Sequence, residues 1–223
     1  MPINQQAYFH LQKELSEKGV TLIAVSKTKP ISDIKELYEL GHRDFGENYV
    51  QELTDKVPQL PNDIRWHFIG HLQRNKVKYI LPFTHLIHGV DSIRLLMEIE
   101  KQASKINKQV SVLLQMHIAR EETKFGLDEA ELQEVIQYIQ QSPLKHVYIK
   151  GMMGMASFSD NPTLINDEFS YLHNLYQKYQ SYQLPNFNFS ILSMGMSGDY
   201  SLAIKNGTNM VRVGSLLFGA RNN

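Results

Sequence analysis

Residues 21–30 read Thr21-Leu22-Ile23-Ala24-Val25-Ser26-Lys27-Thr28-Lys29-Pro30, and they carry the strongest single prediction in this chain. The run of apolar and β-branched residues predicts a strand buried on both faces, as in parallel sheets. Pro30 has no amide proton, so it cannot continue a strand ladder. We therefore expect Lys27 at the C-terminal end of a buried strand.

A lysine in that position has two interpretations. If the amine is partly removed from water, its neutral form is favoured, and this form attacks aldehydes to give an imine. Lys27 would then be a Schiff-base lysine. The alternative is a solvated lysine just past a strand end, because lysines are mostly exposed.

The rest of the chain repeats the order strand, then helix. We expect further strands at residues 42–46, 65–70, 84–88, 110–116, 147–155, 189–193 and 209–213. Helices are expected at 3–15, from Ser32 as cap to Gly41, from Glu47, at 75–80, at 93–103 capped by Asp91 or Ser92, around 132–139, at 163–180 and at 197–207.

About eight such units are enough to close a parallel (β/α)8 barrel. A doubly wound open sheet is the alternative. The barrel is favoured because polar residues and glycines follow many of the expected strands, on the face where barrels build their sites. No linker or low-complexity tract interrupts the pattern, so we expect residues 1–223 to form a single α/β domain.

The composition excludes several functions. With 23 Lys plus Arg against 23 Asp plus Glu, no net charge attracts the chain to nucleic acid or anionic lipid. The absence of cysteine excludes disulfides, thiolate catalysis and cysteine-ligated metal. No leader pattern and no apolar run of membrane-spanning length is seen, so we expect a cytoplasmic protein without a membrane partner.

Two glycine-serine turns predict a phosphate site. Ser197 and Gly198 lie in the loop after the seventh strand, and Gly214 and Ser215 follow the eighth. Amides and a hydroxyl at a helix start suit phosphate, and barrels commonly hold phosphate in these two loops. Each turn alone is more often a capped helix, but both together favour a ligand.

Other candidates are ambiguous. Arg212 could face the barrel mouth or form an ion pair with a neighbouring strand, and Asn48 could bind a ligand or cap a helix. His67 and His71 have the spacing of metal ligands on a helix, but the segment is a predicted strand, so we expect no metal. The methionines at 152, 153, 155, 194 and 196 are expected to pack in the core.

Six blocks of sequence, in order over roughly residues 20–221, resemble the pyridoxal phosphate homeostasis proteins of the YggS/PROSC type. The blocks are Ala24-Val25-Ser26-Lys27-Thr28-Lys29-Pro30, Phe45-Gly46-Glu47-Asn48-Tyr49-Val50-Gln51-Glu52, Trp66-His67-Phe68-Ile69-Gly70-His71-Leu72-Gln73-Arg74-Asn75-Lys76, Met153-Gly154-Met155-Ala156, Leu192-Ser193-Met194-Gly195-Met196-Ser197-Gly198-Asp199 and Val211-Arg212-Val213-Gly214-Ser215.

The resemblance implies a barrel like the N-terminal domain of alanine racemase, with pyridoxal 5'-phosphate held as an aldimine on Lys27. It further implies that Arg212 faces the pyridine nitrogen and that Asn48 and Ile69 flank the ring. The implied phosphate contacts are Ser197, Gly198, Gly214 and Ser215. Position 215 is a serine where many relatives have threonine, which keeps the hydroxyl.

The resemblance also bears on catalysis. An arginine at the ring nitrogen keeps its own proton, so the pyridine stays unprotonated and is a weaker electron sink. Alanine racemases, by resemblance, add a catalytic tyrosine from a β-domain of a partner subunit, and we expect no such domain after Asn223. We therefore expect a monomeric, non-catalytic carrier that passes pyridoxal phosphate to apo-enzymes.

Two alternatives remain. One is a racemase or decarboxylase of amino acids that uses Tyr49, His67 or Lys29 as proton carrier. The other is an aldolase that uses Lys27 without a cofactor.

Overall fold

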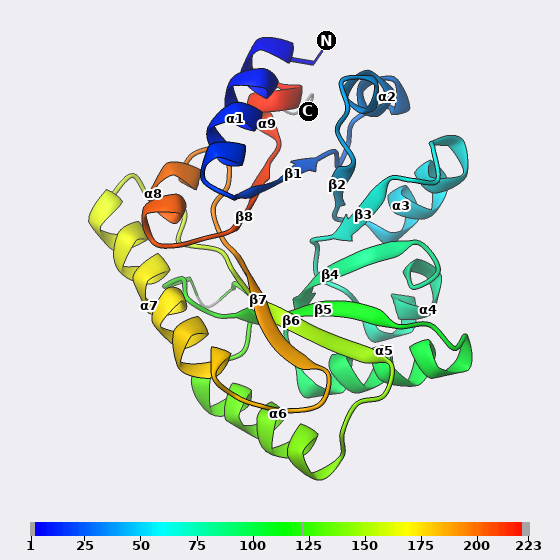
Figure 1. Cartoon of the computed structure of the whole chain (residues 1–223), viewed down its shortest axis with the longest axis vertical. Coiled ribbons are helices and arrows are strands. Elements are labelled where there is room, and N and C mark those ends of the chain that lie inside the picture. The colour runs from blue at the N-terminus through cyan, green and yellow to red at the C-terminus, as the bar shows by residue number, and fades with distance from the viewer. Residues whose placement is uncertain (1–2, 122, 220–223) are drawn as a thin grey trace.

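In the computed structural model, which describes residues 3–121 and 123–219, eight parallel strands form a closed barrel (Figure 1). Each strand pairs with the next one in sequence, and β1 closes the ring by pairing with β8. The barrel prediction is thus confirmed and the open sheet is excluded. The strands are β1 (Thr21–Val25), β2 (Asp44–Glu47), β3 (Arg65–Phe68), β4 (Thr84–Val90), β5 (Val110–Met116), β6 (Val147–Gly154), β7 (Phe187–Ser193) and β8 (Met210–Val213).

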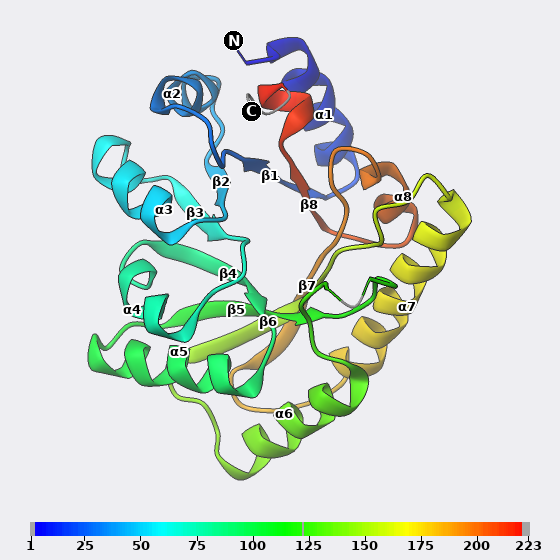
Figure 2. The same cartoon turned by 180° about the vertical axis from the view of Figure 1, so that it is seen from behind.

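Helices surround the barrel as an outer ring (Figures 1 and 2). Helix α1 (Gln5–Glu17) lies beside α9 (Ser215–Phe218) in both views, and the amide of Asn4 bonds to the carbonyl of Leu217 at 2.8 Å. None of the helices in residues 3–121 and 123–219 could cross a membrane. The other helical segments are α2 (Ile31–Glu39), α3 (Val50–Lys56), η1 (Val57–Gln59), η2 (Arg74–Lys76), α4 (Val77–Ile80), α5 (Ile93–Lys105), α6 (Glu129–Gln141), α7 (Pro162–Gln180) and α8 (Tyr200–Lys205).

Two apolar cores hold this arrangement together. The larger core lies between the barrel and the helices, and burial of its aliphatic and aromatic side chains is the main stabilising term. The smaller core fills the inside of the barrel with Ile23, Leu86, Leu113, Met153 and Met210. Since side chains alternate between the two faces of a strand, every second residue from these positions also faces inward.

That alternation fixes which residues reach the C-terminal opening of the barrel, here called the mouth. Counting in twos from Ile23 leads to Lys27, and counting from Met210 leads to Arg212 and Gly214. Gly46 also faces inward, because a Cβ atom added there would lie 3.0 Å from Ile23 and 3.1 Å from Ile69. The same alternation on β2 takes Gly46 to Asn48.

Several predicted details are corrected. Helix α2 begins after Pro30, and Ser32 bonds to the neighbouring carboxylate of Asp33 instead of capping the helix. Glu47 ends β2, and α3 begins only at Val50. Helix α8 begins at Tyr200, because residues 196–199 form a turn first.

Other details are confirmed. The hydroxyl of Ser92 caps α5 by accepting the amide of Leu95. Met152 and Met194 pack in the outer core, Met153 packs in the inner core, and Met155 packs against the inner core. Met196 was expected in the core, but it is 38% exposed because it lies in the loop after β7.

Candidate functional site

The turn that presents Lys27 is fixed on both sides. The buried hydroxyl of Ser26 donates to Glu47 Oε1 at 2.6 Å. Thr28 adopts a left-handed backbone conformation, with φ of 63°, and its amide donates to Glu52 Oε1 at 2.6 Å. A threonine is strained there, so the hydrogen bond to Glu52 helps to hold it. Lys27, between them, is half-buried.

A buried ion pair supports this turn from below. Lys56 Nζ lies 2.8 Å from Glu47 Oε1 and 2.6 Å from Glu52 Oε1, and it also donates to the carbonyl of Ser26 at 2.9 Å. Burial raises the pKa of Glu47, although Lys56 and Ser26 act in the opposite direction. The second oxygen of this carboxylate, Oε2, has no hydrogen-bond partner among the described residues. Lys56 therefore forms structural ion pairs and a hydrogen bond beside Lys27.

Lys29 has a different environment from Lys27. Its ammonium group donates to the carbonyl of Phe218 at 2.8 Å and lies 3.4 Å from the carbonyl of Gly219. These bonds tie the loop after β1 to the end of α9. Of the two lysines in this loop, Lys27 lies nearer to the barrel, two residues after the end of β1 at Val25.

Asn48 and Ile69 follow neighbouring strands at the mouth. The N-cap of α3 is Tyr49, so the interpretation of Asn48 as a helix cap is wrong. Asn48 Oδ1 is buried and has no partner in the described part of the chain. Buried polar atoms are nearly always hydrogen-bonded to protein or water, so this oxygen can accept a hydrogen bond from a group outside the chain. The amide of Ile69 donates to the carbonyl of Glu47 at 2.9 Å, which fixes the two strand ends together.

Arg212 is 4% exposed and lies inside the barrel. Its Nη1 donates to Ser193 Oγ at 2.7 Å and its Nη2 to the carbonyl of Gly154 at 2.9 Å. Both partners are neutral, so the predicted alternative of an ion pair with a neighbouring strand residue is wrong. Burial lowers the pKa of Arg212 to about 10, with Asp199 acting in the opposite direction, and the group remains a cation at neutral pH. Ser193 and Gly154 were not predicted as its partners.

The loops after β7 and β8 meet, as the sequence predicts. The amide of Gly214 donates to Ser197 Oγ at 3.2 Å, and the amide of Arg212 bonds to the carbonyl of Gly195 at 3.0 Å. Gly195 has a φ of +93°, which favours glycine at this turn. Ser215 is the first residue of α9.

Gly198 and Gly214 differ in the space around them. A Cβ atom added to Gly198 would meet nothing within 4 Å, so this backbone is open to a ligand. A Cβ atom added to Gly214 would lie 3.3 Å from Val25, which brings the loop after β8 beside β1.

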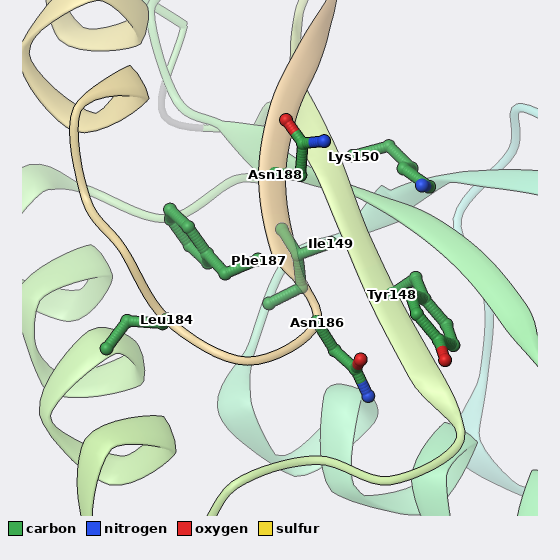
Figure 3. A pocket seen from close by; sticks show the side chains of 7 residues that line it. All are labelled: Tyr148, Ile149, Lys150, Leu184, Asn186, Phe187 and Asn188. Carbon is green, nitrogen blue, oxygen red and sulfur yellow. The ribbon is translucent and has the colours of Figure 1, made fainter.

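Two further hollows lie away from the mouth. One, of about 240 Å³, is lined by residues of β6, β7 and the segment before β7 (Figure 3). In the figure Tyr148 and Lys150 project to one side and Phe187 to the other. The second, of about 410 Å³, is lined by residues at or near the starts of several strands, among them Thr21, Asp44 and Arg65. It marks the N-terminal opening of the barrel.

The two histidines considered as metal ligands, His67 and His71, have different partners. His67 lies in β3 and contacts His88, whereas His71 contacts Asp91. Within residues 3–121 and 123–219, no group of three or more His, Cys, Asp or Glu residues could hold a metal ion.

Comparison with known proteins decides the family. Residues 6–222 match the family described as "Alanine racemase, N-terminal domain". A pyridoxal phosphate homeostasis protein of Pasteurella multocida is 35% identical over 213 residues, which cover 94% of this chain and 90% of the relative. The chain belongs to the pyridoxal phosphate homeostasis protein family. A family member from Aquifex aeolicus is 39% identical over 208 residues, covering 92% of this chain and 89% of the relative.

Solved structures agree with this family. PipY of Synechococcus elongatus without pyridoxal phosphate superposes with a TM-score of 0.89, at 34% identity over 96% of this chain and 99% of that one. PipY has also been solved with pyridoxal phosphate bound, and that structure gives a TM-score of 0.86. An alanine racemase of Clostridium difficile shares the fold, with a TM-score of 0.73 at 15% identity, and the match covers 59% of the racemase.

Proposed function

We propose that this protein binds pyridoxal 5'-phosphate covalently through Lys27 and passes it to apo-enzymes that need it. The observation that carries the proposal is the gathering of complementary groups at one mouth. An amine follows β1, a guanidinium lies on β8, and a hydroxyl-amide cluster joins the loops after β7 and β8. The structure of PipY with pyridoxal phosphate bound supports the choice of ligand.

Each part of the ligand has a matching group. When bound, the ligand would supply an aldehyde carbon that reacts with amines, and Lys27 would hold the ligand through that carbon. We assign the phosphate to Ser197, Gly198, Gly214 and Ser215, since hydroxyls and amides at a helix start suit an anion.

The ring is assigned to three further groups. Arg212 would donate to the pyridine nitrogen, and Ile69 would pack against the ring. The unpartnered Oδ1 of Asn48 would accept a hydrogen bond from the ligand, which removes the cost of leaving it unsatisfied.

We further propose that the protein is a carrier and not a catalyst. Arg212 is a permanent donor at neutral pH, so it leaves the ring nitrogen without a proton and weakens the ring as an electron sink. Of the three suggested proton carriers, Lys29 bonds to Phe218 and His67 lies deep in the barrel. Tyr49, which is 57% exposed, is the remaining candidate for racemase or decarboxylase chemistry.

Titration with pyridoxal phosphate followed by absorbance tests the binding proposal. We expect a yellow complex, and we expect borohydride followed by peptide mapping to place the label on Lys27. No uptake would contradict the proposal and would leave the cofactor-independent aldolase.

Incubation with single amino acids in deuterated water tests the carrier proposal. Rapid exchange of the α-proton of any amino acid would favour the racemase or decarboxylase.

Addition of an apo-enzyme to the loaded protein tests transfer. We expect the ligand to be lost to the apo-enzyme faster than it is lost to buffer.

A further inference from the structure

A line of hydrogen-bonded side chains runs through the inside of the barrel from Arg212 to the N-terminal opening. Arg212 Nη1 lies 2.7 Å from Ser193 Oγ, which lies 3.3 Å from His88 Nδ1. His88 Nε2 lies 3.0 Å from His67 Nδ1. His67 Nε2 lies 3.1 Å from Asp44 Oδ1, in the wall of the 410 Å³ hollow. The line crosses five strands in the space order β8, β7, β4, β3 and β2.

When both histidine rings are neutral, the two ends fix the direction of every hydrogen bond in this line. An arginine can only donate, and an ionised aspartate can only accept. Ser193 therefore gives its one proton to His88 Nδ1, so His88 carries its proton on Nε2 and donates it to His67. His67 likewise carries its proton on Nε2 and donates it to Asp44. The opposite direction would leave an unprotonated His67 nitrogen facing a carboxylate.

Charges around the line agree with this direction. Burial alone would raise the pKa of Asp44, but hydrogen bonds from His67 and Arg65 hold it well below its usual range. Burial lowers the pKa of both His67 and His88, so both rings are neutral at pH 7. Other charged or titratable groups around the line are Asp199 near Arg212, Arg65 and His42 beside Asp44, and His85 beside His67.

The line is isolated from water over its central part. His88 and Ser193 are fully buried, and His67 is 2% exposed. The inner apolar core occupies the same space and includes Leu86 and Met153. In such surroundings electrostatic effects are screened less than in water, and hydrogen bonds in a chain polarise one another. Barrel interiors are usually filled by branched apolar residues. A charge at one end of a polar line through such an interior therefore acts more strongly on the group at the other end than it would through water.

We propose that Asp44, His67, His88 and Ser193 are positioning residues that hold Arg212 in place and transmit the negative charge of Asp44 to it. The line gives the buried cation a distant counter-charge without a carboxylate at the mouth, where it would compete for Arg212. It also couples the N-terminal opening of the barrel to the ligand site at the other end. The part of this inference that concerns pyridoxal phosphate rests on the proposed function.

The first test needs no ligand. In apo protein with ¹⁵N-labelled histidine, long-range proton-nitrogen spectra at pH 7 report the tautomer of each ring. We expect His67 and His88 as neutral rings with the proton on Nε2. A proton on Nδ1 of either ring would contradict the proposed direction of hydrogen bonds along the line, whether or not the protein binds pyridoxal phosphate.

The second test is a double-mutant cycle on the affinity for pyridoxal phosphate. Asp44→Asn keeps the size and the acceptor but removes the charge, and Ser193→Ala interrupts the line without adding bulk. We expect Asp44→Asn to lower the affinity by about tenfold in the wild-type background, within the range of couplings through packed networks. In the Ser193→Ala background the same change should have an effect of less than about twofold, because the connection is already broken.

One variant serves as a matched control. His85→Ala removes a ring that lies beside His67 but outside the line. It should leave the affinity unchanged. An equal effect of Asp44→Asn in both backgrounds would overturn the proposal, since Asp44 would then act through the fold alone. Failure of the wild-type protein to bind pyridoxal phosphate would instead contradict the proposed function. The histidine spectra of the apo protein would still test the line of hydrogen bonds.

Discussion

The amide of Gly214 donates a hydrogen bond to the hydroxyl of Ser197 across 3.2 Å, and this bond joins the loops after β7 and β8. The hydroxyl oxygen accepts from the protein, and its own proton remains for another acceptor. A phosphate oxygen placed between the two loops would accept a hydrogen bond from this hydroxyl. The contact therefore preorganises one donor of the proposed phosphate site, which reduces the cost of ordering it on binding.

Replacing Ser197 should weaken binding without removing the covalent link. We expect Ser197→Ala to lower the affinity for pyridoxal phosphate by about 1 to 3 kcal/mol, the cost of a lost hydrogen bond to a charged group. The yellow complex should still form at high ligand concentration. Equilibrium titration followed by absorbance measures both quantities. Ser201→Ala, an exposed serine on α8, is the matched control, and an equal loss there would contradict the assignment.

The two lysines of the loop after β1 should separate function from stability. We expect Lys27→Ala to abolish the yellow complex and the borohydride-trapped product. Lys29→Ala should keep both but lower the free energy of unfolding by about 1 kcal/mol, because it loses the bond to the carbonyl of Phe218. Absorbance and urea denaturation check the two effects. The reverse pattern would show that Lys29 is the reactive amine.

The unpartnered oxygen of Asn48 predicts opposite effects on stability and binding. Asn48→Leu removes a buried acceptor that lacks a partner and keeps a similar side-chain volume. We expect the apo protein to become about 1 kcal/mol more stable, since leaving such an atom unsatisfied has a cost of this order. The affinity for pyridoxal phosphate should fall in the same variant. If both quantities fell, Asn48 would be a structural residue.

The fold could be predicted from the sequence because its signals are local and repeated. Apolar runs such as residues 21–25 and 110–116 mark buried strands, and their number fixes the closed barrel. Boundaries were less accurate where tertiary contacts override local preference. Glu47 was expected to open a helix, but its ion pair with Lys56, nine residues later, keeps it at the end of β2.

The internal contacts of the site could not be predicted in the same way. Ser193 was visible only as the first residue of a glycine-rich loop, and His88 as the end of an expected strand. Their relation to Arg212 depends on which strands face each other across the barrel, which a period of two alone does not specify. One signal was available: side chains alternate between the two faces of a strand, and this alternation turns both Ser193 and His88 towards the inside of the barrel.

The two buried histidines also predict how stability changes with pH. The pKa of His88 lies well below its usual value because of burial and then because of the nearby His67 and Arg212, and burial likewise lowers the pKa of His67. An unfolded histidine takes up a proton near pH 6.5, whereas these folded ones do not. The unfolded state therefore binds more protons below about pH 6.5. The stabilising effect is complete above that pH and is lost as the pH falls towards the folded pKa values.

We expect each of these histidines to lower the free energy of unfolding by about 1 kcal/mol per pH unit below 6.5. Other groups contribute with the opposite sign, since burial raises the pKa of Glu47 and Asp199. The useful quantity is therefore the difference between wild type and His88→Asn in urea denaturation between pH 7.5 and 5.5. The slope of the variant should be smaller by about half a proton on average over this range, and by nearly one proton at its acidic end. Equal slopes would mean that His88 takes up a proton as readily in the folded protein as in the unfolded chain, and below about pH 6.5 a charged ring could not accept the hydroxyl proton of Ser193.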